Sequence, residues 1–152
     1  MEVKRIHNTD NKLIFPQTYN EDDTWVGKPN GLWYGINDSW NKYCKTHFPE
    51  WIYKNNFELI LSIDNMLILQ ETQDIEVFSS KFSKVSKNNE NIIDWKEVSK
   101  IYQGIEIFPY TKNKVRFEKG WLNKNPWYDA WEVSSGCLFT TQAIKQLNRL
   151  RI

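Results

Sequence analysis

Aromatic side chains stand out in this chain of 152 residues, where Trp, Tyr and Phe make up 15% of the sequence and Trp alone occurs eight times. Several of them fall close together between residues 28 and 44, around the apolar run GLWYG. Large rings usually fill protein cores, but they also stack on nucleobases. We assign most of these rings to the core and regard the Trp residues within polar loops as candidates for ligand contact.

Two acidic residues, Asp129 and Glu132, precede the last apolar run, GCLFT at residues 136–140. A carboxylate beside a reacting centre stabilises developing positive charge or accepts a proton. The plain alternative is a solvated loop carboxylate. Glu132 is the first choice for a catalytic role and Asp129 the second.

Residues 28–44, KPNGLWYGINDSWNKYC, resemble the NAD-binding core of the ADP-ribosyltransferases. In poly(ADP-ribose) polymerases and their mono-transferase relatives, a glycine precedes a strand of the type Gly-Ile-Tyr-Phe-Ala. A Ser-bearing turn and a helix that ends near Tyr-Cys follow. The chain also resembles, more loosely, small phage and bacterial proteins that carry Lys-Pro-x-Gly-Gly-Leu-Trp.

The resemblance implies roles for individual residues. Trp33 takes the place of the strand aromatic, with Tyr34 beside it, and Tyr43 that of the helix tyrosine that stacks on nicotinamide. Ser39 lies where a serine bonds the carboxamide of NAD. At the N-terminus, His7 would bind the adenosine-side ribose and Arg5 the diphosphate. For each of these residues the alternative is a core or surface role.

The chemistry implied by the resemblance is loss of nicotinamide from NAD, which is a substrate here, and transfer of ADP-ribose. This reaction builds an oxocarbenium-like cation that a carboxylate stabilises, and the resemblance assigns that part to Glu132. Two departures from the family pattern are visible. Asn8 follows His7 where the family has Gly, and Ser134 and Ser135 separate Glu132 from the last apolar run.

We therefore expect a mono-ADP-ribosyltransferase-like enzyme, acting on a nucleic acid or a protein as a toxin, a phage protein or a phage-defence component. An antitoxin or defence partner would suit such a role. The displaced glutamate favours a second hypothesis, a non-catalytic module that binds or sequesters NAD or an ADP-ribose-derived nucleotide. A third is an interaction protein in which GLWYG is only core.

The order of apolar segments predicts one α+β domain over residues 1–152. The resemblance implies a mixed or antiparallel split sheet with short flanking helices, as in ADP-ribosyltransferases. A tight turn at Asp64-Asn65 would join two of the strands as a hairpin. Strands are expected at residues 3–7, 31–35, 57–63, 66–70, 105–108 and 136–140, and helices at about 38–46, 72–83, 94–102 and 141–150.

Charge and cysteine content limit the partners. Lys and Arg total 20 against 19 Asp and Glu, so the net charge of +1 argues against strong non-specific attraction to nucleic acid or to an anionic membrane. The two cysteines predict buried thiols and a cytoplasmic location, and no zinc-ligand spacing occurs. However, residues 110–135 interleave basic and aromatic side chains, which suits either a single-stranded nucleic-acid groove or a solvated loop.

Overall fold

The computed structural model describes residues 3–20, 28–86, 89, 91–111 and 127–151. Within them, one mostly antiparallel sheet of seven strands has the order β4-β7-β8-β2-β1-β3-β9, and only β4 and β7 pair in parallel. The α+β class is therefore confirmed. The strands of this sheet are β1 (Arg5–Thr9), β2 (Leu32–Ile36), β3 (Asn55–Leu61), β4 (Met66–Leu69), β7 (Gly104–Ile107), β8 (Ser135–Leu138) and β9 (Ile144–Leu150).

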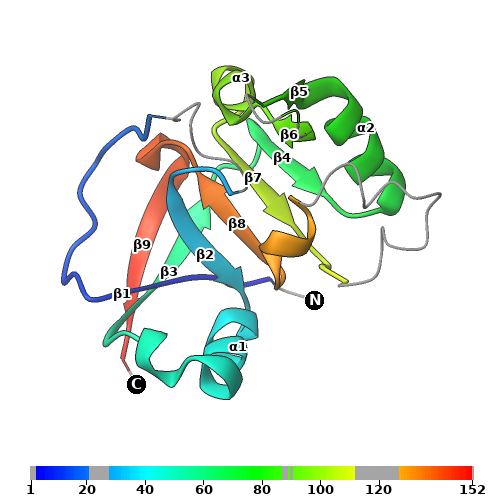
Figure 1. Ribbon diagram of the computed structural model, residues 1–152. Helices are drawn as coiled ribbons and strands as arrows, with labels where there is room; N and C mark the ends of the chain where they lie inside the picture. The colour runs from blue at the N-terminus through cyan, green and yellow to red at the C-terminus, as the bar shows by residue number, and fades with distance from the viewer. Residues whose placement is uncertain (1–2, 21–27, 87–88, 90, 112–126, 152) are drawn as a thin grey trace.

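Helices gather around two parts of this sheet (Figure 1). The helices α2 (Thr72–Phe82) and α3 (Trp95–Ile101) lie beside β4 and β7, next to the small hairpin of β5 (Ser83–Val85) and β6 (Asn91–Ile93). The helix α1 (Ser39–His47) lies at the end of β2 and continues into the 3-10 turn η1 (Pro49–Trp51). Two further 3-10 turns, η3 (Asp129–Trp131) and η4 (Thr141–Ala143), precede β8 and β9.

Side chains alternate between two hydrophobic clusters because successive residues of a strand point to opposite faces. Ile105, Ile107 and Cys137 face the cluster beneath α2 and α3, which also contains Trp131. Tyr34, on the opposite face of β2, belongs to the second cluster, and Trp33 packs against the first. Trp33 therefore faces away from the second core.

The expected hairpin at Asp64-Asn65 is wrong. The turn itself forms, because the Met66 amide donates to the Ile63 carbonyl at 3.1 Å. However, β3 already pairs with β1 on one side and β9 on the other, so β4 pairs with β7 instead. The turn carries the chain from one part of the sheet to another.

The expected helix at residues 141–150 is also wrong, since only η4 is helical and β9 follows it. Ala143, Ile144, Leu147 and Leu150 do have helical spacing. Pairing of β9 with β3 satisfies the backbone groups of an otherwise open sheet edge, and this non-local gain outweighs the local pattern. Both cysteines are buried thiols, as the sequence predicts.

Candidate functional site

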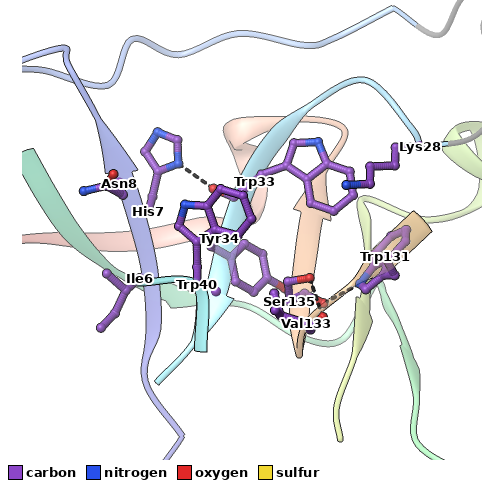
Figure 2. Close-up of a pocket in the computed structure, with 11 residues that line it drawn as sticks. Ile6, His7, Asn8, Lys28, Trp33, Tyr34, Trp40, Trp131, Val133 and Ser135 are labelled. Atoms are coloured by element: carbon purple, nitrogen blue, oxygen red, sulfur yellow. Dashed lines mark hydrogen bonds between the residues drawn. The ribbon is translucent and has the colours of Figure 1, made fainter. Parts of the chain in front are cut away.

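A cavity of about 240 Å³ lies against β1 and β2, between α1 and the segment that joins η3 to β8. Drug-sized ligands occupy pockets of roughly 300–1,000 Å³, so this cavity fits an aromatic ring with a sugar rather than a whole dinucleotide. Its lining residues are Ile6, His7, Asn8, Lys28, Trp33, Tyr34, Gly35, Trp40, Trp131, Val133 and Ser135 (Figure 2).

The close approach of α1 to β2 places Trp40 in the cavity wall. A Cβ atom at Gly35 would lie 2.8 Å from the Cβ of Trp40, so only glycine permits this contact. The Ser39 hydroxyl, at the first residue of α1, donates to the Ser134 carbonyl at 2.7 Å. The start of the helix is thereby fixed to the segment that precedes β8, and both sides of the cavity are connected.

His7 lies on the β1 side of the cavity, where β1 and β2 separate (Figure 2). Its Nδ1 is 2.5 Å from the Trp33 carbonyl oxygen. Because a carbonyl oxygen only accepts, Nδ1 carries the proton, and Nε2 of the neutral ring is left as an acceptor. Burial lowers the pKa of His7, partly opposed by this hydrogen bond, so the ring is neutral at pH 7. An acceptor of this kind suits a sugar hydroxyl.

Across the cavity from His7 stand two tryptophans and a lysine (Figure 2). The rings of Trp33 and Trp131 have centroids 4.8 Å apart at an angle of 57°. The Trp131 indole N–H donates to the Ser135 carbonyl at 3.2 Å, which fixes this ring. The ammonium nitrogen of Lys28 lies 5.6 Å from the Trp33 ring centroid. This side of the cavity thus offers aromatic faces and one positive charge.

Glu132 lies between two lining residues, Trp131 and Val133, in a strained backbone conformation. Its φ is 72° and its ψ is −38°. The Val133 amide donates to the Trp131 carbonyl at 2.9 Å, which closes a three-residue γ-turn centred on Glu132. Such turns with positive φ are rare and strained for residues other than glycine, and strain of this kind is concentrated at functional sites.

The Glu132 side chain is exposed and is not part of the cavity lining. It reaches Tyr43 on α1. Burial raises the pKa of the Tyr43 hydroxyl, and the nearby Glu132 carboxylate raises it further. The carboxylate thus lies near Tyr43, at the rim where the γ-turn places it. The side chain of the second acidic candidate, Asp129, lies outside the described residues.

Of the residues singled out from the sequence, the structure brings His7, Trp33 and Tyr34 to the cavity lining. The Tyr34 side chain points to the opposite face of the sheet, where its hydroxyl donates to Glu106 at 2.9 Å. Arg5, Ser39, Tyr43 and Glu132 do not line the cavity.

Arg5 makes an ion pair with Glu106, in which Nε lies 2.6 Å from Oε1. Its guanidinium is therefore already paired, on the face of the sheet that carries the second hydrophobic cluster.

Sequence reasoning missed five polar or aromatic residues of the lining, Asn8, Lys28, Trp40, Trp131 and Ser135. Two of these had a signal in the sequence, because Trp40 follows Ser39 within the segment of resemblance and Trp131 adjoins Glu132. Most of the basic and aromatic residues proposed for a nucleic-acid groove in residues 110–135 lie outside the described residues. Trp127 is described, and it is buried in the first core.

Comparison of the chain with protein-family models, curated proteins and solved structures finds no match. Among the described residues, no helix is long and apolar enough to cross a membrane.

Proposed function

We propose that the cavity binds the nicotinamide end of NAD and that the protein is a mono-ADP-ribosyltransferase-like enzyme. One observation carries the proposal: a strained γ-turn presents Glu132 at the rim of an aromatic cavity. The nicotinamide ring of NAD is flat and positively charged. Tryptophan faces attract such rings by stacking and by cation–π interaction.

Polar groups around the cavity match the remaining parts of NAD. The Nε2 acceptor of His7 suits a ribose hydroxyl. The ammonium group of Lys28 suits the diphosphate, for which the sequence had suggested Arg5. Since the cavity holds little more than one ring and its sugar, the adenosine half of NAD would extend beyond it.

The reaction breaks the bond between the nicotinamide nitrogen and ribose C1′, and nicotinamide leaves with the electron pair. The acceptor's nucleophilic atom forms the new bond to C1′, and its proton passes to the Glu132 carboxylate. The same carboxylate stabilises the positive charge that develops on the ribose in the transition state. Tyr43 acts as a positioning residue, because its hydroxyl lies near the carboxylate and can donate a hydrogen bond to it.

The test is release of nicotinamide from NAD, measured by chromatography, together with NAD binding by calorimetry. Wild-type protein should release nicotinamide. Glu132→Gln should bind NAD with unchanged affinity and turn over about 10²–10³-fold more slowly, the usual cost of removing one electrostatic group. Glu97→Gln is the matched control, because Glu97 is an exposed acid on α3 that does not line the cavity. Equal rates for Glu132→Gln and wild type would refute the catalytic role.

A non-catalytic module that binds or sequesters NAD or an ADP-ribose-derived nucleotide is the second candidate function. It is favoured by the exposure of Glu132 and by the cavity lining, which contains no carboxylate among the described residues. Binding of NAD without nicotinamide release, in the presence of protein, DNA and RNA acceptors, would establish this function in place of the first.

A further inference from the structure

Aromatic rings extend from the cavity to the surface of α1 and η1. Trp40, a cavity residue, is stacked on Tyr43 with centroids 5.6 Å apart and on Trp51 with centroids 6.2 Å apart. Trp51 is stacked in turn on Phe48 at 4.2 Å. The planes of these three pairs differ by only 22°, 18° and 16°. We call Trp40, Tyr43, Phe48 and Trp51 the aromatic strip.

The outer end of the aromatic strip is open to solvent. Trp51 is 39% exposed, and the next two residues, Ile52 and Tyr53, are each 41% exposed. Soluble proteins rarely leave adjoining large apolar side chains exposed unless they serve as a binding surface. This end of the strip is therefore a candidate binding surface.

Asn8 holds this surface in place from β1. Its side-chain amide donates to the Tyr53 carbonyl at 2.8 Å, and its side-chain oxygen accepts from the Tyr53 amide at 2.8 Å. The segment after η1 is thus fixed to a residue that also lines the cavity. A surface that is ordered before binding loses less conformational entropy when a partner arrives.

The charges beside the aromatic strip favour an anionic partner. Residues 45–54 are exposed except for Phe48 and carry two lysines, Lys45 and Lys54, against one acid, Glu50. His47 adds a ring 4.7 Å from that of Tyr43. An apolar peptide would use the rings but not the cations. A single-stranded nucleic acid uses both, because its bases stack on aromatic faces while its phosphates attract lysines.

We infer that the aromatic strip binds single-stranded nucleic acid, which is the acceptor of the reaction. The role of the nucleic acid as acceptor rests on the proposed function, whereas the binding surface is inferred from its own geometry. The strip runs from exposed Trp51 to Trp40 in the cavity wall, with the Glu132 carboxylate near Tyr43. A single-stranded nucleic acid lying on these rings would bring one of its nucleotides to the mouth of the cavity. Within a duplex, neighbouring pairs cover the base faces, so only the terminal pairs could stack in this way.

Fluorescence anisotropy with labelled 12-nucleotide oligo(dT) and oligo(U), without NAD, tests the surface. Wild-type protein should bind at least one of them more tightly than a duplex of equal length. Trp51→Ala should weaken binding roughly five- to hundred-fold, the range expected for losing one stacked base. Lys45→Ala with Lys54→Ala should reduce the dependence of log K on log salt by about 0.7 per lysine.

The matched controls are Phe15→Ala, which removes a ring that is 66% exposed, and Lys12→Ala, which removes an exposed cation. Both lie outside the aromatic strip and should leave binding unchanged. No oligonucleotide binding, equal binding by Trp51→Ala, or preference for the duplex would overturn the inference. If the wild-type protein binds oligonucleotides but releases no nicotinamide, the binding surface is supported and the proposed enzymatic function is refuted. The two failures are therefore distinguishable.

Discussion

Arg5 and Glu106 form an ion pair across the sheet, from β1 to β7, with Nε 2.6 Å from Oε1. The Glu106 side chain is only 3% exposed, whereas that of Arg5 is 18% exposed. The pair therefore leaves very different groups behind when one partner is removed. Tyr34 donates a further hydrogen bond to Glu106, and its ring lies where a Cβ at Gly136 would collide with it.

We predict that Arg5→Ala lowers the free energy of unfolding by about 3–5 kcal/mol, because it leaves a buried carboxylate without its counter-charge. Glu106→Gln should cost less, since the guanidinium left behind is partly solvated. Urea unfolding monitored by circular dichroism, without any ligand, measures both. A destabilisation under 1 kcal/mol for Arg5→Ala would show that the pair is not structural and would restore Arg5 as a ligand contact.

Strain at Glu132 leads to an opposite effect on stability. Glycine adopts positive φ without a Cβ penalty, so Glu132→Gly should raise the free energy of unfolding by roughly 1 kcal/mol after the greater entropy of the unfolded glycine is deducted. The same variant should lose nicotinamide release. Thermal unfolding of Glu132→Gly beside Glu132→Gln separates backbone strain from the charge. If Glu132→Gly is less stable than wild type, the γ-turn is not strained and the structural argument for the catalytic role fails.

His7 gives the protein a pH dependence whose sign follows from its lowered pKa. In the unfolded chain the ring titrates near 6.5, and in the folded protein it takes up a proton only at lower pH. The unfolded state therefore binds more protons between these two values, so stability falls as the pH drops below about 6.5. Chemical denaturation at pH 7.5 and pH 5.5 should show this loss, and His7→Gln should reduce it.

The exposed residue His47 provides the control. His47→Gln should leave the loss of stability between pH 7.5 and pH 5.5 as it is in the wild type. A loss that is identical in His7→Gln and wild type would assign the effect to carboxylates instead.

Local signals in the sequence predicted much of what surrounds the cavity. The glycine-bounded run GLWYG and the polar residues after it located β2 and α1 to within one residue at each end. Such elements depend on contacts between near neighbours in sequence. The structure of the segment 141–150 could not be predicted from such local contacts. Its strand forms by pairing with β3, about 90 residues away, despite its own helical spacing.

The site was harder to predict than the elements. His7 and Trp33 were singled out, but their hydrogen bond depends on how β1 and β2 separate after their first pairs. Trp131 reaches the cavity only because η3 folds back over the first core. The conformation of Glu132 has no sequence signal, since glycine or asparagine is the usual residue at positive φ.

The last prediction concerns the different roles of two aromatic residues of α1. The resemblance assigned nicotinamide stacking to Tyr43, but the cavity is lined by Trp40 instead. We therefore expect Trp40→Ala to weaken NAD binding by roughly 1–3 kcal/mol, by analogy with base–aromatic stacking. Tyr43→Phe keeps the ring and removes only the hydroxyl that lies near Glu132, so it should leave NAD affinity unchanged.

Turnover distinguishes these two variants further. If the Tyr43 hydroxyl positions the carboxylate, Tyr43→Phe should lower kcat without changing KM, and its effect should vanish in a Glu132→Gln background, where the group it positions is already gone. Calorimetry with NAD and nicotinamide release under saturating NAD measure the two quantities separately. Additive effects of Tyr43→Phe and Glu132→Gln would show that the two residues act independently. Weaker NAD binding by Tyr43→Ala than by Trp40→Ala would return the stacking role to Tyr43.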